Sequence, residues 1–186
     1  MAVAVVLAAG TSSRLGQPKA LLSIADSTLV GLVVSLLSEV CDEVIVVTRS
    51  ELQVDVMLAA PGARVVVNPH PEAGRTGSIQ VGLMALEKPP RALIVPVDRP
   101  AFTISVLHSL LATKRSSRPV CDGRGGHPVN LSPRDIEKVL AASPSAPLRE
   151  LVRFTDIPVQ DADFSLNVDT PADLAALEQW YEAQGR

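Results

Sequence analysis

The chain of 186 residues has few of the side chains that build metal clusters or disulfide frameworks. It contains two cysteines, Cys41 and Cys121, far apart in sequence and without a histidine or second cysteine at metal-ligand spacing. This scarcity argues against a zinc site or a disulfide framework and fits a reducing compartment. No uninterrupted apolar run approaches the roughly 20 residues that cross a bilayer. We therefore expect a cytoplasmic protein without a membrane partner.

The chain also lacks an excess of charge of either sign. It has 17 basic and 20 acidic side chains, for a formal net charge of −3. No broad basic surface for duplex nucleic acid is expected, although a few cations can still form a local phosphate pocket. With 47% hydrophobic residues, a chain of this length can bury a sufficient core without covalent cross-links. We expect a single domain that spans residues 1–186.

Apolar runs that alternate with helical stretches predict the fold class. Continuous apolar runs are typical of strands buried on both faces, and they occupy residues 3–7, 44–47, 65–67 and 93–97. Helical stretches lie between and after them, at residues 27–40, 52–59, 78–86 and 103–111. The alternation predicts an α/β fold with a Rossmann-like, mainly parallel sheet and helices on both faces. After residue 116, frequent proline and glycine predict an elaborated edge of the same domain.

A glycine-containing segment, LAAGTSSRLGQPK at residues 7–19, directly follows the first predicted strand. Gly10 and Gly16 permit close backbone approach and unusual dihedral angles. Amides and hydroxyls between these glycines can donate to anionic oxygens, and they belong to Thr11, Ser12 and Ser13. The segment contains neither GxxxxGK[ST] nor GxGxxG, so it supports neither a P-loop ATPase nor an NAD-dependent oxidoreductase.

Two cations in this segment indicate which anion it binds. Arg14 can make a planar, bidentate contact with a phosphate group, and Lys19 can act as a compact point charge. Together they suit a triphosphate, which carries several negative charges. On composition alone, an ordinary Ser/Gly-rich turn with solvated cations remains the alternative.

The segment resembles the signature of the MobA-like nucleotidylyltransferases, LA[AG]GxSxRxGxxK, and four later blocks extend the resemblance through almost the whole chain. Within that family the chain is similar to the molybdenum cofactor cytidylyltransferase type. The resemblance implies a nucleotide site formed by Leu7, Ala8, Ala9, Gly10, Thr11, Ser12, Ser13, Arg14, Lys19 and Ser78.

Ser78 belongs to the second block, NPHPEAGRTGSIQVGL at residues 68–83. This block joins the third strand to a helix that we expect to begin near Gly77 and Ser78, where backbone N–H groups would face a ligand. The resemblance implies that Ser78 contacts the base or the sugar of the nucleotide. From local chemistry alone, a simple N-cap role for Ser78 is equally consistent.

Two further blocks suggest a metal site. LIVPVDRPAF places Asp98 directly after a buried strand, at the carboxyl edge where ligands of parallel sheets collect. LNVDTPADL contains Asp169, with Asn167 as the second candidate in that block. Magnesium commonly uses one or two carboxylates together with substrate phosphates. The resemblance implies that Asp98 and Asp169 hold Mg²⁺. From local chemistry alone, Asp98 could be a turn or cap residue, and Asp169 could merely precede the helix cap.

The last of these blocks also predicts the start of a final helix. Thr170 is a suitable N-cap, Pro171 suits the first helical position, and Asp173 stands where the acid of a capping box belongs. We expect this helix to run to about Tyr181.

The fourth block, CDGRGGHPVNL at residues 121–131, resembles the acceptor loop of the family. The resemblance implies that Arg124 and His127 contact the acceptor, with a structural turn as the alternative. His127 has no second histidine or cysteine at metal-ligand spacing. Arg99 departs from the family pattern, which generally has an uncharged residue after the aspartate. We expect Arg99 in the acceptor pocket, where it would favour an anionic substrate, unless it turns outward.

Together the blocks imply that the chain transfers a nucleoside monophosphate to an acceptor phosphate and releases pyrophosphate. The resemblance assigns catalytic roles to Arg14, Lys19 and Asp98, with Mg²⁺ as cofactor. The LAAG form of the first block favours CTP over GTP, and overall resemblance favours molybdopterin as acceptor, with a molybdoenzyme or its chaperone downstream. Two alternatives stay open: an enzyme acting on a sugar or alcohol phosphate, and a weakly catalytic nucleotide-binding module in molybdoenzyme maturation.

Overall fold

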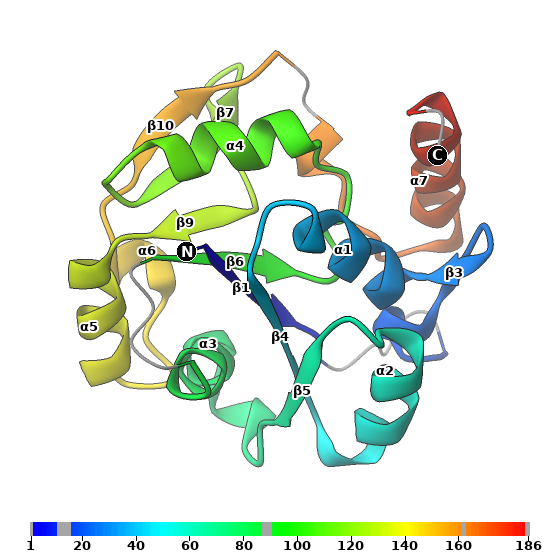
Figure 1. Cartoon of the computed structure of the whole chain (residues 1–186), viewed down its shortest axis with the longest axis horizontal. Helices are drawn as coiled ribbons and strands as arrows, with labels where there is room; N and C mark the ends of the chain where they lie inside the picture. Colours follow the sequence, from blue (N-terminus) through cyan, green and yellow to red (C-terminus); the bar gives the residue numbers. More distant parts are fainter. Residues whose placement is uncertain (1, 11–15, 87–90, 161–162, 185–186) are drawn as a thin grey trace.

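The computed structural model describes residues 2–10, 16–86, 91–160 and 163–184. Its centre is an eight-stranded sheet of order β10-β7-β9-β6-β1-β4-β5, with β8 paired to β7 (Figure 1). The strands of this sheet are β1 (Val3–Leu7), β4 (Glu43–Thr48), β5 (Arg64–Val67), β6 (Ala92–Pro96), β7 (Ser117–Cys121), β8 (Arg124–Gly125), β9 (Val129–Leu131) and β10 (Thr155–Pro158). The short strands β2 (Ser23–Ile24) and β3 (Ser27–Thr28) form a separate antiparallel pair.

The predicted α/β class is confirmed, and β1 forms the middle of the parallel part of the sheet. It pairs in parallel with β4 on one side and with β6 on the other. The apolar run of β1 is continuous because both faces of this strand are covered. The expectation that all four apolar runs are buried on both faces is wrong for β5. This strand lies at the end of the sheet order and its residues are exposed or half-buried.

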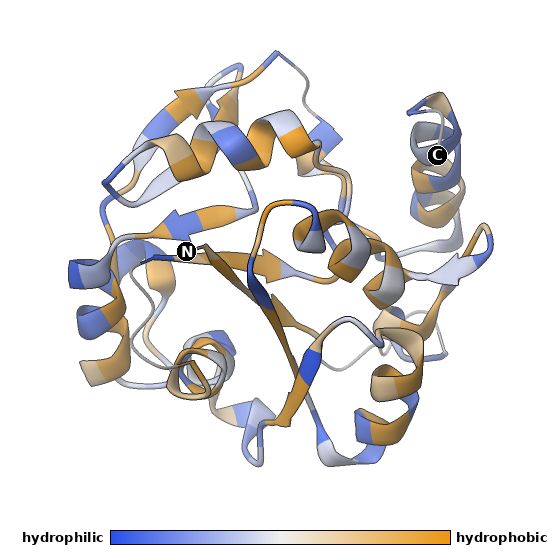
Figure 2. Cartoon of the chain, viewed as in Figure 1, coloured by the Kyte–Doolittle hydropathy of each residue, from blue (hydrophilic) through white to orange (hydrophobic). Residues whose placement is uncertain are grey.

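Helices cover both faces of the sheet, as the alternation predicts. One face packs against α1 (Leu29–Ser38), α2 (Gln53–Ala59), α4 (Ile104–Ala112) and α7 (Pro171–Ala183). The other face packs against α3 (Arg75–Met84), α5 (Pro133–Ala141) and α6 (Leu148–Leu151). Figure 2 shows the central strands in the colours of hydrophobic residues, whereas several outer helices carry hydrophilic stretches. Within the described residues, none of the helices combines the length and the apolarity that crossing a membrane requires.

The start of α3 differs from the expectation. The helix begins at Arg75, three residues before Ser78, with Gly74 as its N-cap. Gly74 has a φ of +128°, and a Cβ at this position would lie 2.6 Å from the carbonyl oxygen of Pro144. Only glycine fits such a conformation and so close an approach. Ser78 is therefore a residue inside the helix and not its cap.

The predicted start of the final helix is confirmed in detail. Thr170 caps α7: its hydroxyl accepts from the Asp173 backbone N–H, while the Asp173 carboxylate accepts from the Thr170 backbone N–H at 2.7 Å. This is a capping box. The helix continues to Ala183, two residues beyond the expected end at Tyr181.

The part of the chain after residue 116 extends the sheet beyond β6. There β9 pairs antiparallel with β6 and β7, and β10 pairs in parallel with β7. The chain then returns to the carboxyl end of β6, where the Val168 backbone N–H donates to the Asp98 carbonyl at 2.8 Å. This contact brings the LNVDTPADL block beside the LIVPVDRPAF block, although about 70 residues separate Val168 from Asp98.

Candidate active site

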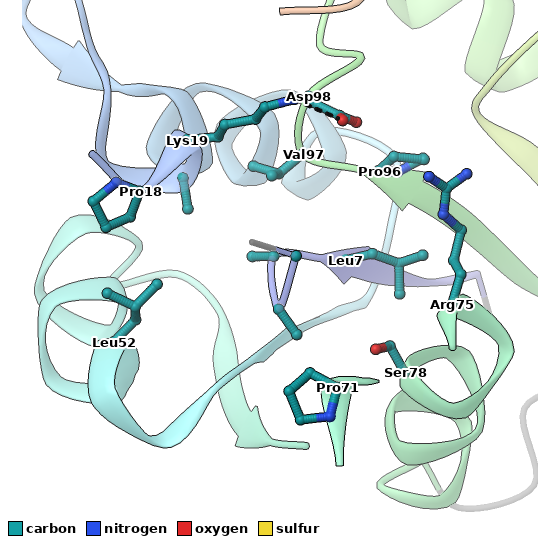
Figure 3. A pocket seen from close by; sticks show the side chains of 14 residues that line it. Leu7, Pro18, Lys19, Leu52, Pro71, Arg75, Ser78, Pro96, Val97 and Asp98 are labelled. Carbon is teal, nitrogen blue, oxygen red and sulfur yellow. Dashed lines mark hydrogen bonds and ion pairs between the residues drawn. The ribbon is translucent and has the colours of Figure 1, made fainter. Parts of the chain in front are cut away.

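A cleft opens at the carboxyl ends of β1 and β6, where the ligands of parallel sheets usually bind (Figure 3). The Val97 backbone N–H donates to the Leu7 carbonyl at 3.1 Å, so the two chain segments run together past the sheet. The cleft has a volume of about 270 Å³. Its lining includes residues of the first three sequence blocks, among them Leu7, Ala8, Ala9, Gly10, Lys19, Arg75, Ser78, Val97 and Asp98.

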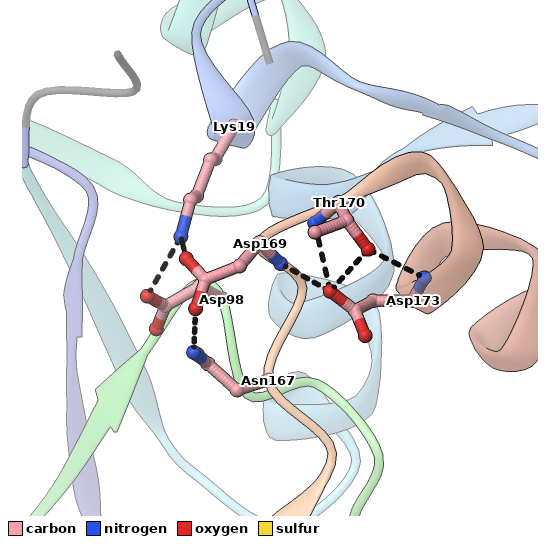
Figure 4. Close-up of polar contacts among 6 residues, drawn as sticks. All are labelled: Lys19, Asp98, Asn167, Asp169, Thr170 and Asp173. Atoms are coloured by element: carbon pink, nitrogen blue, oxygen red, sulfur yellow. Dashed lines mark hydrogen bonds and ion pairs between the residues drawn. The ribbon is translucent and has the colours of Figure 1, made fainter. Parts of the chain in front are cut away.

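Lys19, Asp98 and Asp169 form a charged cluster beside this cleft (Figure 4). Lys19 and Asp98 line the cleft, whereas Asp169 reaches the cluster from outside its lining. Lys19 Nζ lies 3.3 Å from Asp98 Oδ2 and 2.6 Å from Asp169 Oδ1. Asp98 lies in a turn two residues beyond the end of β6, and not directly after the strand as expected. The three side chains come from three distant parts of the sequence, and one ammonium group holds both carboxylates together.

The segment before α7 holds Asp169 in place. The Asp169 backbone N–H donates to Asp173 Oδ2 at 3.0 Å, and the Asn167 side-chain amide donates to Asp169 Oδ2. The hydrogen bond from the Thr170 hydroxyl, together with the backbone N–H groups of Asp169 and Thr170, lowers the pKa of Asp173. Asp173 therefore stays ionised and fixes the backbone from which the Asp169 carboxylate projects. Asn167, the second candidate ligand, presents its amide nitrogen to Asp169 in this arrangement.

The chemistry of this cluster fits a divalent cation. The Lys19 ammonium is itself a cation within reach of both carboxylates, so oxygens of Asp98 and Asp169 can converge on one positive charge. Within the described residues there is no group of three or more acidic, histidine or cysteine side chains that could hold a metal ion. Two carboxylates suit magnesium, which completes its coordination with phosphate oxygens and water.

Ser78 lies in the wall of the cleft, in the first turns of α3. Its hydroxyl accepts a hydrogen bond of 3.0 Å from the Asn68 side-chain amide, and both residues are buried. The Asn68 side-chain oxygen in turn accepts from the His70 backbone N–H at 2.9 Å. Asn68 therefore fixes the Ser78 hydroxyl against the cleft, a role that sequence reasoning did not assign. The sequence offers one indication of this role: Asn68 directly follows the predicted strand at residues 65–67.

The predicted phosphate loop is only partly described. Thr11, Ser12, Ser13 and Arg14 lie outside the described residues. Gly16 has a φ of +67°, so an unusual dihedral angle does require glycine there. At Gly10, by contrast, a Cβ would meet no atom of the described residues within 4 Å.

A second cavity, of about 630 Å³, shares Leu7 and Arg75 with the cleft. Arg99 and His127 both line it, in agreement with their expected proximity. Arg124 does not belong to the described lining, because it lies in an exposed two-residue strand, β8, that pairs with β7. The structure thus brings two of the three predicted acceptor residues together.

His127 is neutral at physiological pH. Burial, followed by the positive charges of Arg99 and Arg75, lowers the pKa of its imidazole to about 4, against the opposing effect of Asp98. Its Nδ1 atom is buried and has no hydrogen-bond partner among the described residues. The positive charge of this cavity therefore comes from arginine side chains.

Sequence reasoning missed three arginines of the second cavity. Arg75, Arg118 and Arg149 line it together with Arg99. They come from α3, β7 and α6, so no spacing in the sequence connects them. Arg75 lies within the second sequence block, but the glycines and Ser78 are the more conspicuous residues of that block.

Comparisons with known proteins agree with this arrangement. The family model for the MobA-like NTP transferase domain matches residues 4–163. A probable molybdenum cofactor guanylyltransferase from Mycobacterium avium (strain 104) is 31% identical over 202 aligned positions, covering 94% of each chain. The molybdenum cofactor cytidylyltransferase from Escherichia coli (strain K12) is 22% identical, covering 95% of each chain. A solved structure from Mycobacterium sp. strain JC1, a homologue of a Mycobacterium tuberculosis protein, has a TM-score of 0.82 at 26% identity and covers 98% of each chain.

The fold, the cleft and these matches define a nucleotidyltransferase. The chain belongs to the MobA-like NTP transferase family, as the five sequence blocks predict.

Proposed function

We propose that the protein transfers CMP from CTP to the phosphate of molybdopterin and releases pyrophosphate. One observation carries the proposal: the cleft with the Asp98–Lys19–Asp169 cluster shares a wall with a basic cavity. A transfer between two phosphates needs two adjacent anion sites, and Arg75 and Leu7 border both. The relatives from Escherichia coli and Mycobacterium avium support this class of acceptor, since both are named for molybdenum cofactor nucleotidyl transfer.

In this proposal the acceptor phosphate oxygen attacks the α-phosphorus of CTP in line. A new bond joins that oxygen to the α-phosphorus, and the bond between the α-phosphorus and the bridging oxygen to the β-phosphate breaks. The electron pair leaves with pyrophosphate. An acceptor phosphate is already anionic near neutral pH, so the step requires no general base and no covalent enzyme intermediate. Positioning and stabilisation of charge provide the rate acceleration.

The residues of the cleft divide this work. Asp98 and Asp169 would hold Mg²⁺, whose charge offsets that of the triphosphate when it is bound. Lys19 would then leave the carboxylates and pair with oxygens of the leaving pyrophosphate. Ser78, fixed by Asn68, would contact the base or the sugar. Arg14, which lies outside the described residues, would complete the phosphate contacts from the first loop.

The choice of CTP rests on the LAAG sequence of residues 7–10, which in our interpretation favours the pyrimidine nucleotide. The relatives named above include both a cytidylyltransferase and a probable guanylyltransferase, so CTP and GTP must be compared directly as substrates.

The test is a parallel assay of pyrophosphate release from CTP, GTP and UTP, each with molybdopterin and with a panel of sugar and alcohol phosphates. We expect release with CTP and molybdopterin at a rate well above that of every other pair. Faster turnover with GTP would overturn the choice of base, and faster turnover with a sugar phosphate would overturn the acceptor. Tight CTP binding without release for any acceptor would show a nucleotide-binding module instead.

A further inference from the structure

The second cavity has an uneven charge distribution. Its described lining includes four arginines and no aspartate or glutamate. Arg118 Nε forms an ion pair of 2.7 Å with Asp156 Oδ1, which compensates its charge. No ion pair joins any of the other three arginines, Arg75, Arg99 and Arg149, to a carboxylate of the described residues. Within the described part of the chain, three positive charges around this cavity therefore have no carboxylate partner.

These charges act on the interior of the cavity. Arg99 and Arg75 both lower the pKa of His127, so their electrostatic field reaches a buried group in the cavity wall. Arg99 is half-buried, so water screens its charge less than that of an exposed side chain. Asp98 acts on His127 in the opposite direction, but no aspartate or glutamate belongs to the described lining of the cavity.

Two of the three uncompensated arginines stand next to the cleft. Arg75 lines both the cleft and the cavity, and its side chain extends from the start of α3 toward Pro96 at the end of β6 (Figure 3). Arg99 follows Asp98 directly in the sequence. A phosphate monoester carries up to two negative charges near neutral pH, and two guanidinium groups balance that charge. Arg149, an exposed residue of α6, lines the cavity but not the cleft, and forms no ion pair with a carboxylate of the described residues.

We propose that the acceptor carries two separate anionic groups: a phosphate held by Arg75 and Arg99 beside the cleft, and a second anion held by Arg149. The assignment of this ligand as the acceptor rests on the proposed function. Apolar side chains of Ile79, Ile94 and Val129 also line the cavity and would pack against the uncharged body of the ligand.

The test uses two small probes that differ by one charge. 3-Phosphoglycerate has a phosphate and a carboxylate, whereas glycerol 3-phosphate has the same phosphate and a neutral hydroxymethyl group. Binding of each probe to the full chain is measured by titration calorimetry, with the cleft saturated by a non-hydrolysable CTP analogue and Mg²⁺. We expect 3-phosphoglycerate to bind about threefold more tightly, the effect of one ion pair with an exposed arginine.

Three variants separate the two anion sites. Arg149→Gln should weaken the binding of 3-phosphoglycerate about threefold and leave that of glycerol 3-phosphate unchanged. Arg75→Gln should weaken the binding of both probes to a similar degree. Arg134→Gln changes an exposed arginine of α5 outside the described lining of this cavity, and should leave both affinities as in the wild type. Equal binding of the two probes to the wild type, or discrimination that survives in Arg149→Gln, overturns the inference.

Pyrophosphate release distinguishes this failure from failure of the proposed function. If the wild-type protein releases pyrophosphate from CTP but binds both probes equally, only the second anion site is overturned. The opposite outcome is also possible to recognise. If the wild type prefers 3-phosphoglycerate, Arg149→Gln abolishes that preference, and no nucleotide yields pyrophosphate, the two-anion site is supported and the proposed function is overturned.

Discussion

Removing the Lys19 ammonium should change metal binding and turnover in opposite directions. Lys19 Nζ forms ion pairs with both Asp98 and Asp169, so a metal cation bound by these carboxylates would compete with the ammonium group. In Lys19→Met the two carboxylates lose this internal counter-ion, so the nucleotide-free protein should bind Mn²⁺ more tightly. Turnover should fall by about two to three orders of magnitude, because the same ammonium would stabilise the leaving pyrophosphate.

The distances give the size of the effect on metal affinity. Even at a dielectric constant of about 80, unit charges 2.6 Å and 3.3 Å apart attract each other by about 1.6 and 1.3 kcal/mol. The side chains of Lys19, Asp98 and Asp169 are 16%, 24% and 33% exposed, so solvent and salt screen part of this attraction. We expect a gain in Mn²⁺ affinity of at least about tenfold, and at most about a hundredfold.

The assay is a titration of Mn²⁺ followed by electron paramagnetic resonance, with and without the CTP analogue. Lys138→Met is the matched control, since Lys138 also forms an ion pair of 2.6 Å with an aspartate, Asp135, but on α5. It should leave both Mn²⁺ affinity and turnover unchanged. An equal or weaker Mn²⁺ affinity in folded Lys19→Met would refute the reasoning.

Three further predictions concern single side chains. Asp98→Asn should lower turnover and shift the magnesium titration to higher concentrations; an unchanged titration would count against Asp98 as a ligand. Asp173→Ala removes the capping box of α7 and should lower the midpoint of urea denaturation; an unchanged midpoint would show that the box does not stabilise the fold. Since the pKa of His127 is lowered from 6.5 to about 4, the folded state binds fewer protons than the unfolded state between these pH values. Stability should fall by up to about 3 kcal/mol as the pH drops through this window, and a His127→Gln variant with the same slope would contradict this.

The sequence predicts the central sheet well because its strands and caps are governed by local patterns. The continuous apolar run of β1 indicates burial on both faces, and the side chains of Thr170 and Asp173 contain the whole capping box of α7. At β5 the same kind of apolar run predicts the strand but not its place at an edge. Strand order depends on tertiary contacts that three consecutive valines do not encode.

The candidate site is predicted to a lesser extent. Family-like blocks single out Lys19, Asp98 and Asp169, but nothing in their spacing shows that one ammonium bridges both carboxylates. The basic cavity escapes prediction because Arg75 and Arg149 reach it from helices that meet only in the folded chain. Isolated arginines are common on protein surfaces, so neither has a local signal.

The most direct test of the central claim is the anomalous diffraction of Mn²⁺ in crystals grown with the non-hydrolysable CTP analogue. The account predicts one anomalous peak bound by oxygens of Asp98, Asp169 and the triphosphate, with Lys19 Nζ moved from the carboxylates to a phosphate oxygen. A peak that lacks either aspartate, or a triphosphate bound outside the cleft between β1 and β6, would contradict it.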